Sequence, residues 1–350
     1  MGKTLIDILE EQGLKLNKSS GGRFTARCPF HDGDNEPSFT IYPNESYYCF
    51  GCEVWGDAVK FLVDYKGMAP RDALEYVGED YRDIKKSPAT VIKLKNAYKS
   101  WRFVGECIQK YHDFLKEVPG TINYLQSRGL SEETIAKFKI GYTDGRVLNL
   151  QFEEEYKLAL EVNLITQKGW ETLSHRIIIP SLIEENACDF AVGRTVINDK
   201  IKYLGLRMPK PLMGFHEVRH SPIIFLVEGP FDWLILRQWG YPAVCLNGTH
   251  LTEHLSKLLY GKQIIIVPDI DEVGLSAANK LKNRFEGAEI LDYSRFSNGV
   301  KLDISAFAEK SGAEEIFKEL VLENFPWLIT TSKGTLERYF PHLKDMTLYR

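Results

Sequence analysis

Four residues near the start of the sequence have the types and the spacing of metal ligands. Two residues separate Cys28 from His31, two separate Cys49 from Cys52, and 17 residues lie between the pairs. Two such pairs place four sulfur or imidazole ligands around one tetrahedral ion, for which zinc is the usual choice. Four protein ligands leave no position for a water molecule, so the pattern predicts one structural zinc ion that does no chemistry itself.

Aromatic residues surround these two pairs. Exposed aromatic rings on a small sheet stack against unpaired bases, and each stacked base contributes about 1 to 3 kcal/mol. A small zinc domain also needs aromatic residues for its core. The sequence leaves both interpretations open for this set, which comprises Tyr42, Tyr47, Tyr48, Phe50 and Trp55.

A second group of residues suited to chemistry is acidic. Glu228 follows the apolar run IIFLV, and Asp232 lies in the first turn of the next predicted helix. Asp269 and Asp271 follow a second apolar run, IIIV, and a proline. Parallel strands end at one edge of a sheet, so Glu228, Asp269 and Asp271 are expected to lie together and to repel one another unless a cation binds. Oxygen ligands favour magnesium or manganese, so we predict a divalent-cation site that meets a phosphate.

Asp303 is a further candidate, because it begins the predicted helix that follows Lys301. Its carboxylate could extend the cation site. An aspartate at this position is also a common N-cap, which accepts a hydrogen bond from the helix backbone. The sequence leaves both interpretations open.

The acidic residues lie within an alternation of strand-length and helix-length segments after residue 221. The strand candidates are residues 223–227, 243–246, 264–267 and 290–291. The helix candidates are residues 231–239, 252–260, 275–285 and 304–310. This alternation predicts βαβ units and a parallel sheet, with functional groups at the carboxyl ends of its strands.

The segments before residue 221 follow other patterns. Short runs separated by turn residues predict small β-hairpins around the zinc ligands, closed by an amphipathic helix that begins at Asp57. Residues 95–141 have a helical pattern in which Ser131 opens a helix, whereas residues 176–180 and 190–193 have the pattern of strands.

Residues 84–105 contain six basic and no acidic side chains. A solvated linker has this composition, and so does a basic tether that follows a phosphate backbone and releases counterions on binding. Both interpretations remain open. The basic residues are Lys85, Lys86, Lys93, Lys95, Lys99 and Arg102.

Length and composition limit the class of protein. A chain of 350 residues, 44% of them hydrophobic, predicts two or three folded domains. The 44 basic and 48 acidic residues give a net charge of −4, so nucleic-acid binding would require local basic patches. Six cysteines are too few for a disulfide scaffold, and apolar runs stop at about six residues, far below the ~20 that span a bilayer. We therefore expect a cytoplasmic protein with no membrane partner.

The motifs of both sites resemble those of the bacterial DnaG-type primases, in which a CHC2-type zinc domain precedes a polymerase core with a Toprim fold. In the zinc domain the similar motifs are Cys28-Pro29-Phe30-His31, Pro37-Ser38-Phe39, Cys49-Phe50-Gly51-Cys52 and Gly56-Asp57-Ala58. In the core they are the segments 124–131, 140–142, 176–180, 193–194 and 202–204, then Gly248-Thr249, Glu228-Gly229-x-x-Asp232 and Asp269-x-Asp271 with Gly274.

The resemblance implies an α/β multidomain fold: a small zinc-ribbon-type β domain, an α+β basic subdomain and a Toprim parallel α/β sheet. The expected boundaries are 1–80 for the zinc-binding domain, 81–115 for a basic linker and helix, 116–220 for the basic N-terminal subdomain of the core, 221–312 for the Toprim subdomain and 313–350 for a short helical tail.

The resemblance also implies roles for single residues. Glu228, Asp269 and Asp271 would be catalytic and would hold magnesium or manganese, with Asp232 and Asp303 in support. The residues expected to bind template or nucleotide are Arg128, Arg176, Arg194, Lys202 and Tyr203.

Three positions depart from the family pattern. Pro230 stands where an aromatic residue is usual, Ile270 replaces the glycine of Asp-Gly-Asp, and Ser305 replaces a second acid after Asp303. Only 38 residues follow Gly312, too few for the family's usual helicase-binding bundle. A shortened primase of a phage, plasmid or other mobile element is expected to look like this.

The predicted function is synthesis of short RNA primers on single-stranded DNA by metal-dependent nucleotidyl transfer during replication. The expected partners are the DNA template, nucleoside triphosphates and a replicative helicase bound through a surface that the sequence does not identify. Two alternatives remain: a Toprim nuclease, and a non-catalytic adaptor that binds single-stranded nucleic acid.

Overall fold

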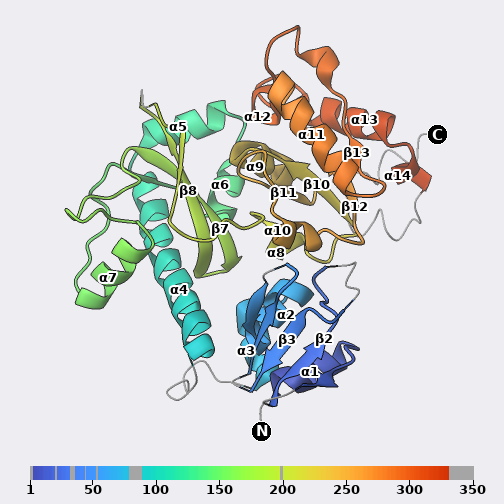
Figure 1. Cartoon of the computed structure of the whole chain (residues 1–350). Coiled ribbons are helices and arrows are strands. Elements are labelled where there is room, and N and C mark those ends of the chain that lie inside the picture. The colour runs from blue at the N-terminus through green and yellow to red at the C-terminus, as the bar shows by residue number, and fades with distance from the viewer. Residues whose placement is uncertain are drawn as a thin grey trace. The chain divides into compact units, whose positions relative to one another are not determined.

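The computed structural model describes residues 3–19, 22–31, 36–43, 45–52, 54–78, 89–197 and 200–330 (Figure 1). Contacts divide the chain into two compact units. The first comprises Met1–Arg102 with Leu251–Tyr260, and the second comprises Phe103–His250 with Gly261–Arg350.

An antiparallel sheet with short helices forms most of the first unit. Its strands are adjacent in chain order: β1 (Asn17–Lys18), β2 (Phe24–Ala26), β3 (Phe39–Tyr42), β4 (Ser46–Cys49) and β5 (Trp55–Asp57). The helices are α1 (Leu5–Glu11), α2 (Ala58–Lys66) and α3 (Pro70–Val77). The predicted small β domain is confirmed.

Local sequence explains how this unit closes. The Asp57 side chain accepts a hydrogen bond from the Lys60 amide and caps α2, and Gly67 ends the helix in the left-handed conformation. Leu9, Phe39 and Phe61, from a helix, a strand and a second helix, are fully buried in one apolar core. The zinc-binding region therefore has a hydrophobic core of its own.

Helices connect this region to the second sheet. They are α4 (Ala89–Leu115), α5 (Pro119–Ser127) and α6 (Glu132–Lys137). Ser131 caps α6 by accepting from the Thr134 amide, as predicted. The basic segment of residues 84–105, for which the sequence allowed a linker or a tether, is helical from Ala89 onward, and Lys85 and Lys86 lie outside the described residues.

The second sheet is antiparallel, and α4 packs along it (Figure 1). Its strands are β6 (Gly141–Thr143), β7 (Arg176–Glu184), β8 (Ala187–Thr195) and β9 (Tyr203–Gly205), with α7 (Glu153–Glu161) between β6 and β7. Val104 and Ile108 of α4 are buried with Ile178 of β7 and Ala191 of β8. Both strands predicted here are present and longer than predicted.

The third sheet is parallel, in the order β11-β10-β12-β13. Its strands are β10 (Ile223–Val227), β11 (Ala243–Cys245), β12 (Gln263–Ile266) and β13 (Glu289–Ile290). The helices of this part are α8 (Phe215–Val218), α9 (Pro230–Gln238), α11 (Glu272–Arg284), the 3-10 helix η2 (Ser294–Phe296), α12 (Ile304–Phe307), α13 (Ala313–Asn324) and α14 (Trp327–Thr330). The intervening helix α10 (Glu253–Lys257) lies within the segment that contacts assign to the first unit. The predicted parallel sheet is confirmed.

Helix α13 belongs to the core beneath the parallel sheet, although we expected a tail to begin at residue 313. Phe317 is fully buried, and its ring centroid lies 5.3 Å from that of Trp239 and 5.2 Å from that of Tyr241. Residues 331–350 of the expected tail lie outside the described residues.

Throughout the described ranges, the helices are all too short or too polar to cross a membrane.

Candidate zinc centre and catalytic site

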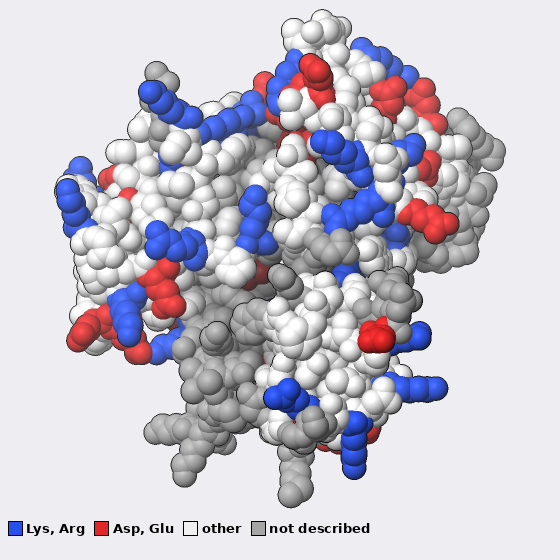
Figure 2. Space-filling model, viewed as in Figure 1, with Lys and Arg blue, Asp and Glu red and all other residues white. Residues whose placement is uncertain are grey.

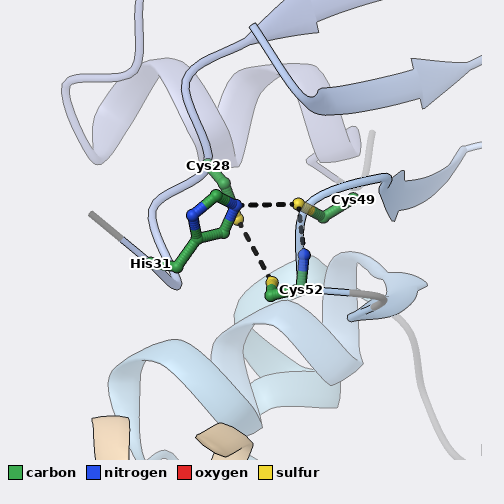
Figure 3. Close-up of side chains that lie close together, drawn as sticks. All are labelled: Cys28, His31, Cys49 and Cys52. Carbon is green, nitrogen blue, oxygen red and sulfur yellow. Dashed lines mark hydrogen bonds between the residues drawn. The ribbon is translucent and has the colours of Figure 1, made fainter. Parts of the chain in front are cut away.

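The four predicted zinc ligands come together in the first unit (Figure 3). Their ligand atoms all lie within 4.8 Å of one another. The Cys28 and Cys52 sulfurs are 3.8 Å apart, and His31 Nε2 is 3.1 Å from the Cys49 sulfur. A tetrahedral zinc with Zn–S bonds of about 2.3 Å requires sulfurs about 3.8 Å apart, so the site fits zinc.

The Cys49 thiol is prepared for ionisation. Burial raises its pKa, but hydrogen bonds from the Ser38 hydroxyl and from the Cys52 and Gly51 amides outweigh burial and bring the pKa to about 6. The thiolate is the form that binds metal. A Cβ atom on Gly51 would lie 2.7 Å from His31 Nε2, so the turn between the last two ligands requires glycine.

The aromatic residues near the zinc site divide between the two predicted roles. Tyr47 is 1% exposed and stacks on Phe39, so it belongs to the core. Phe50 is 67% exposed, and its ring contacts Tyr48 edge to face. An exposed ring beside the zinc ligands is the kind of surface that stacks against a base.

The acidic residues gather at the carboxyl edge of the parallel sheet. Strands β10 and β12 are hydrogen-bonded neighbours with Leu226 opposite Ile266, so Glu228 and Asp269 follow strands that end side by side. Asp271 caps α11 by accepting from the Gly274 amide at 2.7 Å. A Cβ on Gly274 would lie 2.5 Å from the Asp269 carbonyl oxygen, so this close approach also requires glycine.

Partial burial makes ionisation of these carboxyl groups unfavourable unless a cation is bound. Burial, and then the nearby Asp269 charge, raises the pKa of Glu228 to about 7. Burial also raises the pKa of Asp269, and it raises that of Asp232, which is 6% exposed, well above the usual range. Desolvated carboxylates with raised pKa values gain most from a bound cation. The donor set therefore fits magnesium or manganese.

Lys301 is a part of the site that sequence reasoning missed. Its ammonium nitrogen lies 2.8 Å from Asp269 Oδ2 and 2.6 Å from Asp271 Oδ2. In the sequence this lysine is recognisable only as a residue just before the Asp303 helix, and 30 positions separate it from Asp271. No local spacing signals such a pair.

Asp303 has the N-cap role that the sequence allowed, since its Oδ1 accepts from the Ala306 amide at 2.7 Å. The Ser305 amide donates to Asp232 Oδ1 at 2.8 Å, which ties the start of α12 to α9. Arg128 donates to the Ser305 hydroxyl at 2.5 Å and to Glu309 at 2.6 Å. At the position of the missing acid, the structure thus places an arginine contact.

The other predicted basic residues differ in their surroundings. Arg194 donates to the hydroxyls of Tyr124 and Tyr203 at 3.0 and 2.8 Å, and its guanidinium lies 4.9 Å from the Phe231 ring centroid. Arg176 is 4% exposed and donates to the Ile201 carbonyl, so its guanidinium is engaged within the fold.

Lys202 is exposed, and partial burial and the Arg194 charge lower its pKa. Lysine, arginine and acidic side chains are interspersed on the face shown in Figure 2.

A cavity of about 320 Å³ opens beside the acidic cluster. Its lining includes Glu228, Asp269 and Asn247, together with Phe190 and Tyr203 of the antiparallel sheet. Both polar atoms of the Asn247 amide are buried without a hydrogen-bond partner among the described residues. The cavity thus combines carboxylates with aromatic and amide groups, as a nucleotide site would.

Comparison with known proteins gives these features a family. Residues 2–91 match the CHC2 zinc finger, residues 110–207 the N-terminal domain of the DNA primase catalytic core, and residues 225–307 the Toprim-like family. The protein thus combines a structural zinc ribbon with a metal-dependent Toprim core.

Curated relatives carry the same combination. The DNA primase of Thermotoga maritima is 31% identical over 314 residues, which cover 83% of this chain and 54% of the relative. That of Rickettsia felis is 29% identical over 362 residues, covering 93% of this chain and 59% of the relative. The chain belongs to the bacterial DnaG-type primase family, and it spans little more than half the length of these relatives.

Solved structures agree in fold. The Aquifex aeolicus primase, with its zinc-binding and RNA polymerase domains, is 25% identical with a TM-score of 0.51, covering 97% of this chain and 89% of that one. A DnaG primase catalytic domain bound to single-stranded DNA is 21% identical with a TM-score of 0.54, covering 74% of this chain and 94% of that one.

Proposed function

We propose that this chain is a DNA primase that synthesises short RNA primers on single-stranded DNA from nucleoside triphosphates. The observation that carries the proposal is the cluster of Glu228, Asp269 and Asp271 at the carboxyl edge of a parallel sheet, beside a cavity large enough for a nucleoside. The matches to the zinc finger and to the primase core domain support the same activity.

Glu228, Asp269 and Asp271 would hold the divalent cation, with Asp232 and Asp303 in support. When bound, the cation supplies activation of the primer 3′-hydroxyl and charge stabilisation on the leaving pyrophosphate. Glu228, Asp269 and Asp271 are half-buried and follow strands that end at one edge of the sheet. Asp271 and Asp303 also cap helices, which holds each carboxylate in a fixed orientation.

Template and nucleotide phosphates would meet the basic side chains of the core. Arg194 is held in orientation by two tyrosine hydroxyls, one of them from Tyr203, and exposed Lys202 lies beside it. Arg128 supports the start of α12. Buried Arg176 would act indirectly, by fixing the loop that carries Ile201.

Further parts of the proposal concern organisation. The domain boundaries we propose are 1–80, 81–115, 116–220, 221–312 and 313–350, with α13 sharing the Toprim core. A primase acts beside a replicative helicase on cytoplasmic DNA in a bacterium, so we propose that location and that class of partner.

The test is incubation of the full chain with single-stranded DNA, labelled ribonucleotides and magnesium. New short RNA supports primase activity, shortened DNA indicates a Toprim nuclease, and binding alone indicates an adaptor. Asp269→Asn is the control, because it keeps the size and shape of the side chain but removes the carboxylate charge that would hold the cation. Synthesis that persists in this variant would contradict the site.

A further inference from the structure

Lys301 occupies the place between two carboxylates where a cation is needed. Its ammonium lies 2.8 Å from Asp269 and 2.6 Å from Asp271, and both contacts are made to Oδ2 atoms. The other oxygen of Asp271 is used by the Gly274 amide. Lys301 therefore takes the oxygen of Asp271 that remains for a metal.

The backbone holds Lys301 in this position. The Ile270 amide, between the two aspartates, donates to the Leu302 carbonyl at 2.7 Å, and these two residues form an isolated antiparallel bridge. Both residues are buried, at 9% and 6% exposure. The contact between the lysine loop and the aspartate loop is thus part of the fold.

A divalent cation and the ammonium cannot share these oxygens. Magnesium binds oxygen at about 2.0–2.1 Å, so a cation held by Asp269 and Asp271 would compete with the ammonium for the carboxylate oxygens that Lys301 now contacts. The Lys301 side chain is 56% exposed and has a flexible stem, so it can leave the carboxylates without disturbing the core.

We propose that Lys301 is a built-in counter-ion: it holds Asp269 and Asp271 together before metal binds, is displaced by the divalent cation, and then pairs with a phosphate of the nucleotide. The last step rests on the proposed function, whereas the first two concern metal binding alone. Before nucleotide binds, Lys301 is a positioning residue, because it acts through the two aspartates.

The test is Lys301→Met in the full chain, with manganese binding measured by electron paramagnetic resonance in the absence of nucleotide. Removing a partly exposed ammonium from two ion pairs should tighten manganese binding about three- to tenfold. The metal-free variant should also melt at a lower temperature, because the two aspartates lose their counter-ion. With saturating manganese, the variant should bind ATP more weakly.

Lys310→Met is the matched control, since Lys310 is an exposed lysine that donates to the Phe296 carbonyl, and it should leave manganese affinity unchanged. Lys301→Arg keeps the charge and should bind manganese no more tightly than the unchanged protein.

Manganese affinity that is unchanged or weaker in Lys301→Met would overturn the inference, as would an unchanged protein that binds no manganese. Failure of the proposed function would appear separately, as absent primer synthesis in a protein whose manganese binding follows these expectations.

Discussion

Replacement of Cys49 by alanine tests whether zinc organises the first unit. The Cys49 side chain is fully buried and accepts hydrogen bonds from the Gly51 and Cys52 amides. The substitution removes one of the four ligands together with these two bonds. We expect loss of the metal and unfolding of the zinc-binding region, with the parallel sheet unaffected.

The expected magnitude follows from the size of the region. Structural zinc contributes about 10 to 16 kcal/mol of apparent binding free energy at neutral pH, whereas a small domain is stable by about 5 to 15 kcal/mol in total. The core that includes Leu9, Phe39 and Phe61 is small, so it cannot replace the metal. Unfolding should extend through Val77, because α3 shares that core.

Two measurements on the full chain check this expectation. Elemental analysis should give one zinc per unchanged chain and none in Cys49→Ala, and hydrogen exchange should show lost protection for residues 5–77 but retained protection for β10 and β12. Cys107→Ala is the control, because Cys107 is a buried cysteine of α4 outside the zinc site. A Cys49→Ala chain with full zinc content or unchanged protection would refute the argument.

Three further perturbations have defined outcomes. Asp269→Ala should lower the rate of primer synthesis a thousandfold or more, because a lost cation ligand removes several kcal/mol of transition-state stabilisation and each ~1.4 kcal/mol is tenfold in rate. Binding of single-stranded DNA, measured by gel shift, should persist. Near-normal synthesis would contradict the assignment of Asp269 to the cation site. Burial raises the pKa of Asp189 from 3.8 to about 7, so the folded state loses stability as the pH rises between these two values. Asp189→Asn should therefore gain stability over the unchanged chain as the pH rises from 4 to 8, by up to about 4 kcal/mol. Parallel pH profiles of the two chains in calorimetry would exclude this. Loss of three lysines should flatten the salt dependence of template binding by about 0.7 per lost phosphate contact, and an unchanged slope would make the segment a linker. These lysines are Lys93, Lys95 and Lys99.

The zinc ligands, and the position of Glu228 and Asp269 at the ends of parallel strands, could be predicted because their signals are local in the sequence. Two pairs of ligands at knuckle spacing have few other uses, and an apolar run that ends in an acid indicates a buried strand with a charge at its carboxyl end. Strand β10 has the predicted bounds, and Glu228 follows it directly. At these sites the sequence pattern predicts where each side chain lies in the fold.

The remaining features depend on contacts between distant segments. The sequence predicts that Arg176 begins a strand, but it does not show what its guanidinium contacts. Only the fold shows that the guanidinium donates to the Ile201 carbonyl. Tyr47 and Phe50 are both aromatic neighbours of zinc ligands, yet Tyr47 faces the core from strand β4, whereas Phe50 lies in the turn after β4 and is exposed. Phe317 looks like part of a tail until its packing against Trp239 is seen.

The departures from the family pattern are connected in space. Ile270 pairs through its amide with Leu302, which places Lys301 on the neighbouring aspartates. Ser305, at the position of a second acid, accepts a hydrogen bond from Arg128. One carboxylate is thus absent and two cationic side chains contact the site or its border, so the cluster carries less negative charge than the family pattern implies. A site with less negative charge holds fewer divalent cations. We therefore expect a single tightly bound manganese ion in the nucleotide-free protein, and a second only when nucleotide phosphates add their own charge.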